Sequence, residues 1–186
     1  DGAALLASTY IGGTNSDGQN IISDNYGDSF KGEIYVDPNG DVYIASMSQS
    51  ADFPTTAGAI QTSSGGSQDG VVVKLPADLS SLTWSTYLGG TGDDAAYSVV
   101  SDSNDDLYVS GTGSTGYLTT AGTYAPAFLG GTADGFVSHI TNDGSTLLAS
   151  SFIGTSGRDQ AFFVQVDKFD QVFVNGQSDG GMTSSS

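Results

Sequence analysis

The stretch Ser85-Thr86-Tyr87-Leu88-Gly89-Gly90 decides the fold, because the chain contains versions of it at other places. An earlier version is Ser8-Thr9-Tyr10-Ile11-Gly12-Gly13, and a degraded later version is Ser150-Ser151-Phe152-Ile153-Gly154. Ordered landmarks that return at one period are the signature of a repeat protein. The chain is therefore predicted to consist of repeated units.

Three further landmarks recur outward from this stretch. They are the aspartates Asp37, Asp102 and Asp167, which lie 65 residues apart, the segments 53–58 and 117–122, and the segments 69–75 and 134–140. We divide the single segment 1–186 into units of about 1–13 (the end of a preceding unit), 14–90, 91–154 and 155–186 (incomplete). The first full unit carries about twelve extra residues within 14–26.

Each unit contains short runs that favour β-strands, separated by clusters of Gly, Asp, Asn and Ser. In the middle unit these runs predict strands at about 95–102, 106–112, 134–141 and 146–154. The segment Asp37-Pro38-Asn39-Gly40-Asp41 is typical of a tight hairpin turn between the first two strands of a unit. One unit is therefore predicted to be a four-stranded antiparallel sheet.

Several predicted strands are apolar on both faces, for example Val42-Tyr43-Ile44 and Phe162-Phe163-Val164. A sheet with one face in water would alternate between apolar and polar residues. Sheets that are covered on both faces by neighbouring sheets occur in β-propellers, whose blades are four-stranded and pack radially. A β-solenoid has shorter repeats, and a twin β-sandwich would not explain three copies. The predicted fold is all-β, a β-propeller segment with an incomplete ring.

Three segments resemble the SBBP repeat of bacterial β-propellers: Ser85–Asp94, Asp52–Ala59 and Asp69–Leu75. Proteins with this repeat are typically large, secreted or surface-exposed, and are often combined with adhesion-type domains. The resemblance covers nearly the whole chain, and it implies an extracellular location and no particular enzymatic reaction. The third unit departs most from the repeat, at Phe152, Arg158 and 167–170.

The composition excludes several classes of function. The formal net charge is −17, and every acidic residue except Glu33 is an aspartate, which favours turns over helix interiors. Such a surface repels the phosphate backbone of nucleic acids. No apolar run approaches the roughly 20 residues that span a bilayer. Cysteine is absent, so neither a disulfide nor a thiolate metal site can form.

The two ends of the sequence suggest an open ring. Residues 3–12 match the last strand of a unit, and the chain stops soon after a second strand. Ring closure needs about four blades or more. We therefore expect the partners to be the remainder of a larger polypeptide or further copies of the segment.

The hairpin turns carry oxygen ligands at alternate positions, as calcium loops do. The calcium candidates are Asp37, Asn39 and Asp41 in the first unit, and Asp102, Asn104 and Asp106 in the second. The alternative is that these residues serve only the geometry of the turn. Neither stretch has the distal bidentate Glu of an EF-hand. Calcium is the only cofactor that the sequence offers.

A second group of carboxylates precedes the first strand of each unit: Asp28, Asp93 with Asp94, and Asp159. If equivalent loops converge on one face, these carboxylates could bind cations or sugar hydroxyls, or hydrolyse a glycosidic bond as a pair. The alternative is stabilisation of turns, which explains better why they recur in every unit.

Other side chains offer weaker candidates. The only histidine, His139, takes the place of Lys74 in the preceding unit, so we expect a residue on a strand face rather than a catalytic base. Trp84, Tyr87 and Tyr97 could stack on a sugar, but core packing explains them more simply. No catalytic residue is assigned.

The inserted loop at 14–26 is the least repeat-like stretch. Ile21, Ile22 and Tyr26 could form a contact surface for a partner. The alternative is a tolerated surface insertion, whose removal would leave the fold intact.

The sequence favours a non-enzymatic, extracellular binding or scaffold module of a secreted or cell-surface bacterial protein, contacting protein or glycan partners. One alternative is a secreted polysaccharide hydrolase or lyase that uses acidic residues on the propeller face. The other is a purely structural spacer.

Overall fold

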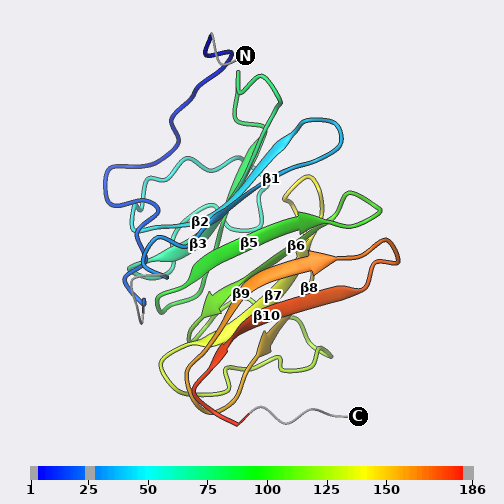
Figure 1. Ribbon diagram of the computed structural model, residues 1–186. Helices are drawn as coiled ribbons and strands as arrows, with labels where there is room; N and C mark the ends of the chain where they lie inside the picture. The colour runs from blue at the N-terminus through cyan, green and yellow to red at the C-terminus, as the bar shows by residue number, and fades with distance from the viewer. Residues whose placement is uncertain (1–3, 24–27, 182–186) are drawn as a thin grey trace.

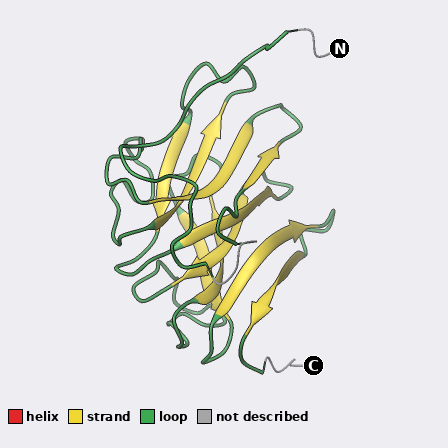
Figure 2. Cartoon of the chain, turned by 60° about the vertical axis from the view of Figure 1, so that its left-hand side comes forward, coloured by secondary structure: helices red, strands yellow, loops and turns green. Residues whose placement is uncertain are grey.

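The computed structural model of the chain describes residues 4–23 and 28–181. These residues contain ten β-strands and no helix, which confirms the predicted all-β class (Figure 1; Figure 2). A helix that could cross a membrane is likewise missing from the described ranges. The strands are β1 (Glu33–Val36), β2 (Val42–Ser48), β3 (Asp69–Leu75), β4 (Trp84–Leu88), β5 (Ala95–Ser101), β6 (Leu107–Gly113), β7 (Asp134–Ile140), β8 (Leu147–Ile153), β9 (Asp159–Val166) and β10 (Val172–Ser178).

The strands form three antiparallel sheets. The first sheet has the order β1-β2-β3-β4, the second has the order β5-β6-β7-β8, and the third consists of β9 and β10. In the second sheet, the ends of all four strands agree with the prediction to within one residue. The alternation of β-favouring runs and turn residues was thus sufficient to predict the strands of the second sheet.

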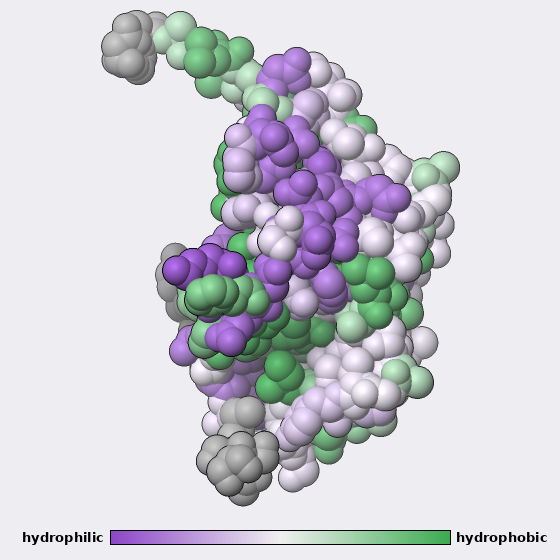
Figure 3. Space-filling view, turned by 90° about the vertical axis from the view of Figure 1, so that its right-hand side faces the viewer, coloured by the Kyte–Doolittle hydropathy of each residue, from purple (hydrophilic) through white to green (hydrophobic). Residues whose placement is uncertain are grey.

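Hairpins of the same geometry begin all three sheets. Their turns span 37–41, 102–106 and 167–171 and lie on the same side of the molecule, at the right of Figure 1. Gly40, Asp105 and Asp170 occupy the same turn position, and all three have positive φ angles, of 89°, 65° and 59°. Figure 3 views this side of the molecule and shows hydrophilic residues gathered over its upper half.

Successive sheets pack on one another in the same way. The first strand of the second sheet, β5, contacts β1, β2 and β3, and the first strand of the third sheet, β9, contacts β5, β6 and β7. The main core lies between the first two sheets and includes Tyr43, Val72, Leu88, Val99, Val109 and Phe136. The opposite face of the first sheet is also apolar, with Val71 and Val73 in a separate core. Both faces of the sheet are therefore buried at β3, as the sequence pattern indicates, whereas the outer face of β1 is exposed.

The first strands of the three sheets are also joined by hydrogen bonds. The Ser98 hydroxyl on β5 donates to the Glu33 carboxylate on β1, and it accepts from the Val164 backbone amide on β9 at 3.2 Å. The same Glu33 carboxylate accepts from the Val99 amide at 3.3 Å. These bonds keep the three first strands in contact along one line through the stack.

Two sequence expectations are wrong. Residues 4–12 form no strand, although their sequence resembles that of β4 and β8. Those strands pair with β3 and β7, and the described residues include no further counterpart of β3 and β7 for 4–12 to join. The extra residues also lie later than expected. Asp17 already bridges to Ser48, at the position in line with β1, and regular pairing resumes only at Glu33. The insertion therefore interrupts the first strand of the first sheet.

Candidate functional site

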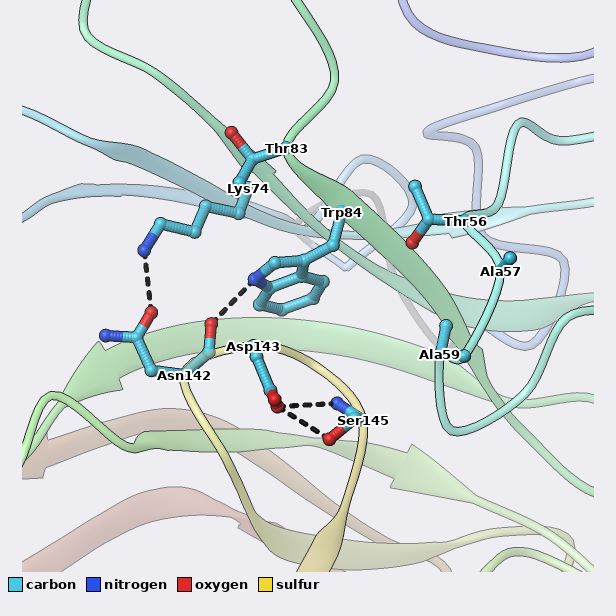
Figure 4. Close-up of a pocket in the computed structure, with 10 residues that line it drawn as sticks. Thr56, Ala57, Ala59, Lys74, Thr83, Trp84, Asn142, Asp143 and Ser145 are labelled. Carbon is cyan, nitrogen blue, oxygen red and sulfur yellow. Dashed lines mark hydrogen bonds between the residues drawn. The ribbon is translucent and has the colours of Figure 1, made fainter.

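A pocket lies between the first and second sheets (Figure 4). It is open to solvent and has a volume of about 520 Å³. Its walls come from the loop after β2, from β3 and β4, and from the turn between β7 and β8. The lining residues are Thr56, Ala57, Gly58, Ala59, Lys74, Thr83, Trp84, Asn142, Asp143 and Ser145.

The indole of Trp84 forms the floor of this pocket and is held in one orientation. Its Nε1–H donates to the Asn142 carbonyl at 2.6 Å, and the residue is only 5% exposed. Gly144 packs against the ring with a φ of 67°, and a Cβ there would lie 2.5 Å from the indole. Glycine at 144 thus permits both the turn and the close approach to Trp84.

The ammonium of Lys74 closes one end of the pocket. It lies 2.6 Å from Asn142 Oδ1 and 3.1 Å from Asp41 Oδ2. Burial disfavours its charge, but hydrogen bonds with Tyr43 and Asp41 outweigh burial and raise the pKa of Lys74. The lysine is therefore charged and already engaged by protein partners.

Asp143 supplies a fixed negative charge at the rim. Its Oδ1 accepts from the Thr141 hydroxyl at 2.6 Å, and from the Ser145 hydroxyl and amide at 2.7 and 3.0 Å. These hydrogen bonds lower the pKa of Asp143. Together with the amide of Asn142 and the indole edge, this carboxylate suits hydroxyl-rich neutral ligands better than anions. No sequence motif indicated the pocket, because its walls come from two different units.

The predicted calcium residues lie in the hairpin turns, where one oxygen of each leading aspartate is already used. Asp37 Oδ1 accepts from the amides of Asn39 and Asp41, each at 2.9 Å. Asp102 and Asp167 hold their own turns in the same way. The turn at 167–171 keeps this arrangement although Gln171 replaces the second acidic residue, which is the behaviour expected of a turn residue. Asn39 and Asn104 are exposed. Calcium binding stays a prediction.

Of the pre-strand carboxylates, Asp28, Asp94 and Asp159 are buried and Asp93 is half-buried, and their alignment differs from the predicted one. Asp17, Asp94 and Asp159 each accept from the backbone amide four residues earlier, at 2.8, 2.6 and 2.6 Å. Asp17 is therefore the counterpart of Asp94, whereas Asp28 belongs to the insertion and was misaligned. Asp93 accepts from the Gln68 amide at 3.2 Å.

Asp94 is fully buried at the junction between the first two sheets. Besides Gly90, it accepts from the Ser114 amide at 2.7 Å. Burial outweighs these hydrogen bonds and raises the pKa of Asp94 to about 7. A carboxyl group without access to solvent cannot contact a polysaccharide in this conformation.

The sequence reasoning missed two further buried carboxyl groups, Asp69 and Asp134, which begin β3 and β7. Asp69 Oδ2 accepts from the amides of Gly65 and Gly66, and Asp134 Oδ2 accepts from the amides of Leu129 and Gly130. In each case Oδ1 is buried and has no hydrogen-bond partner. The recurring Asp-Gly dipeptide at 69–70 and 134–135 was the signal that could have found them.

The remaining candidates are core residues or lie on strands. Tyr87 and Tyr97 are fully buried, so the core-packing interpretation is confirmed for both. His139 lies on a strand face, as predicted, and stacks on Tyr108 with ring centroids 4.1 Å apart. Its contact with Asp102, from Nε2 to Oδ2 at 3.2 Å, was not predicted.

The inserted loop is built into the stack of sheets. Asn20 is buried and donates to the Tyr97 hydroxyl at 2.8 Å, and the Ile21 amide donates to Gln68 Oε1 at 2.8 Å. The Arg158 guanidinium, from the third sheet, donates to the Ile22 carbonyl. These contacts contradict the interpretation that the insertion is merely tolerated at the surface. Tyr26 lies outside the described residues.

Comparisons of the sequence with protein-family models and with curated proteins find no match. The resemblance to the SBBP repeat stays a prediction that rests on the residues quoted for it.

Proposed function

We propose that this chain is a segment of a β-propeller that serves as a non-enzymatic binding or scaffold module of a secreted or cell-surface bacterial protein. The observation that carries the proposal concerns one repeat position. Ile34, Val99 and Val164 lie 65 residues apart on the first strands of the three sheets, and they are 66%, 1% and 0% exposed. Val99 and Val164 are covered by the preceding sheet. A further sheet of the same repeat would cover Ile34 in the same way.

The other end of the stack supports the same proposal. Phe173 on β10 is 56% exposed, whereas its counterpart in the first sheet, Tyr43, is fully buried in the core shared with the next sheet. Apolar faces of this kind mark contact surfaces. Sheets that repeat one packing relation, with hydrogen bonds between their first strands, fit the radial arrangement of blades. The covering sheets would come from the rest of a larger polypeptide or from further copies.

Self-association tests the scaffold proposal. Sedimentation velocity over a wide range of concentrations should show assembly, and Ile34→Asp should weaken it without unfolding the chain. Asn104→Asp adds the same charge at an exposed turn residue and serves as the matched control. Two results together would contradict the proposal. The wild-type chain would stay monomeric, and it would bind no more of an apolar dye than the Ile34→Asp variant binds.

The pocket between the first two sheets supports a glycan as the ligand of the module. Its polar groups come from Asn142, Asp143 and Ser145 beside the edge of an indole. Retention on a panel of immobilised polysaccharides tests this assignment. Ala57→Trp would fill the pocket without removing a hydrogen bond, and Ala51→Trp places the same side chain at an exposed site outside it. Equal retention of both variants would contradict a role for the pocket.

A secreted hydrolase or lyase is the alternative from another class. The burial of Asp94 and Asp159 supports a role for both in the fold rather than in catalysis. The same panel of polysaccharides distinguishes an enzyme from a binding module. Release of product by the wild-type chain that is lost in a folded Asp94→Asn variant would favour the hydrolase. A structural spacer is favoured if no polysaccharide is retained and calcium leaves the Tm unchanged.

A further inference from the structure

We propose that Asp102, Asp106 and His139 bind one divalent transition-metal ion, of which Zn²⁺ is the representative. One ligand atom from each of the three side chains lies within 4.8 Å of the others. The residues come from two segments that are distant in sequence, namely the β5–β6 turn and β7. A bound ion would therefore join the turn to the third strand of the second sheet.

The distance between the first two ligand atoms fits a metal site. His139 Nε2 and Asp102 Oδ2 are 3.2 Å apart. Ligands at about 2.0–2.2 Å from a tetrahedral zinc ion are separated by roughly 3.4 Å, so little movement is required for these two. The stack of His139 on Tyr108, with an angle of 4° between the rings, fixes the plane of the imidazole.

Both carboxylates are positioned through one oxygen, which leaves the other to face a cation. Asp102 Oδ1 accepts from the amides of Asn104 and Asp106, at 2.8 and 3.0 Å. Asp106 Oδ1 accepts from the Asn142 amide at 3.0 Å. Hydrogen bonds that orient the ligands in this way are typical of protein metal sites.

The first unit shows that this position in the sheet holds a positive charge. Lys74 is the counterpart of His139, and its ammonium lies 3.1 Å from Asp41, the counterpart of Asp106. It also lies 5.0 Å from the centre of the Tyr43 ring. Asp102 and Asp106 belong to the second unit. Within residues 4–23 and 28–181, no lysine or arginine forms an ion pair with either of them. A metal ion would supply the charge that the lysine supplies in the first unit.

The ligand set selects the kind of ion. An imidazole nitrogen with two carboxylates suits zinc and related transition ions, whereas calcium prefers oxygen ligands alone. The site therefore differs from the calcium loop predicted for 102–106, although it shares two residues with that loop. Three protein ligands leave a fourth position for water.

The chain contains one histidine, which allows a direct test on the unmodified protein. A zinc titration followed by NMR should shift the imidazole signals, all of which belong to His139. Isothermal titration calorimetry at moderate salt, with excess calcium present, should show one strong zinc site. His139→Lys copies the residue of the first unit, and it should weaken zinc binding by about tenfold or more while the fold is retained.

The reciprocal variant tests whether the geometry is sufficient. Lys74→His places an imidazole beside Asp37 and Asp41, and a second equivalent of zinc is expected. Unshifted imidazole signals in the unmodified chain overturn the proposal. So does equal zinc affinity in the unmodified chain and in folded His139→Lys, or full competition by calcium at equal concentration.

Discussion

The carboxyl groups of Asp134 and Asp159 interact with each other inside the protein, at the junction of the second and third sheets. Both side chains are almost completely buried, and each has a buried Oδ1 atom with no hydrogen-bond partner. Two negative charges in this place would repel each other. Burial, and then the proximity of Asp159, raise the pKa of Asp134 to about 6.

The raised pKa values of Asp134 and Asp94 predict that the free energy of unfolding falls as the pH rises. In the folded chain the pKa of Asp134 is about 6 and that of Asp94 is about 7, above the ordinary value of 3.8 for an aspartate. The folded state therefore binds more protons than the unfolded state between pH 3.8 and these values. The stabilisation is complete below about pH 4 and is lost by about pH 7. Thermal melts from pH 4 to pH 8 measure it.

Asp134→Asn should reduce this dependence on pH. The asparagine carbonyl can accept from the amides of Leu129 and Gly130, and its NH₂ group can donate to Asp159. Above pH 7 the variant should be more stable than the wild-type chain by on the order of 1 kcal/mol or more. An unchanged pH profile would show that the pair does not hold a proton.

Replacing Asp105 with glycine should stabilise the second hairpin. Asp105 has a φ of 65°, and Gly40 occupies the same position in the first hairpin. Relief of this strain exceeds the added freedom of the unfolded chain, so urea unfolding should show a gain of about 0.5 kcal/mol. The reciprocal change, Gly40→Asp, should destabilise the chain, since a Cβ there would also lie 3.2 Å from that of Ala77. A loss in Asp105→Gly would contradict this explanation.

Asn20→Ala should destabilise the fold, although the residue belongs to an insertion. The substitution removes the donor to the Tyr97 hydroxyl and the acceptor for Gln68 Nε2, at 2.8 and 2.9 Å. Buried groups left without partners cost about 1–3 kcal/mol. Asn15→Ala, at an exposed position just before the insertion, is the control and should change stability little. Equal effects of the two substitutions in urea unfolding would refute a structural role for the loop.

Val99→Ala and Ile34→Ala test the packing between sheets at one repeat position. Val99 is buried by the first sheet, so its truncation should cost about 2 kcal/mol. Ile34 is mostly exposed, and the same truncation should cost less than about 0.5 kcal/mol in the monomer. Comparable losses would mean that the two sheets do not stack as described.

The sequence was sufficient to predict the sheets because strand and turn signals are local. The positions of β5 to β8 follow from apolar runs bounded by Asp, Asn and Gly, and these signals recur in each unit. The same regularity misled the alignment of the first unit. Asp28 and Asp17 both precede strand-like residues, and they are distinguished by the bridge of Asp17 to Ser48 and by its hydrogen bond from the Gly13 amide.

The sites could not be predicted in the same way, because they join different units. The pocket brings Trp84 of the first unit to Asn142 of the second, and the Asp134–Asp159 pair spans the second and third. Such contacts depend on how sheets stack, and no local pattern encodes that. His139 was correctly placed on a strand, yet its approach to Asp106 required the fold of the hairpin turn.

The exposure of β10 determines where unfolding of the chain begins. Most of its side chains lie in solvent, and among the described strands it pairs with β9 alone. In a linear array each layer is stabilised only by the layers next to it, so loosening begins where neighbours are fewest. Backbone amides of β10 should therefore exchange with deuterium first, followed by β9, while the interior of the second sheet remains protected until the whole molecule opens.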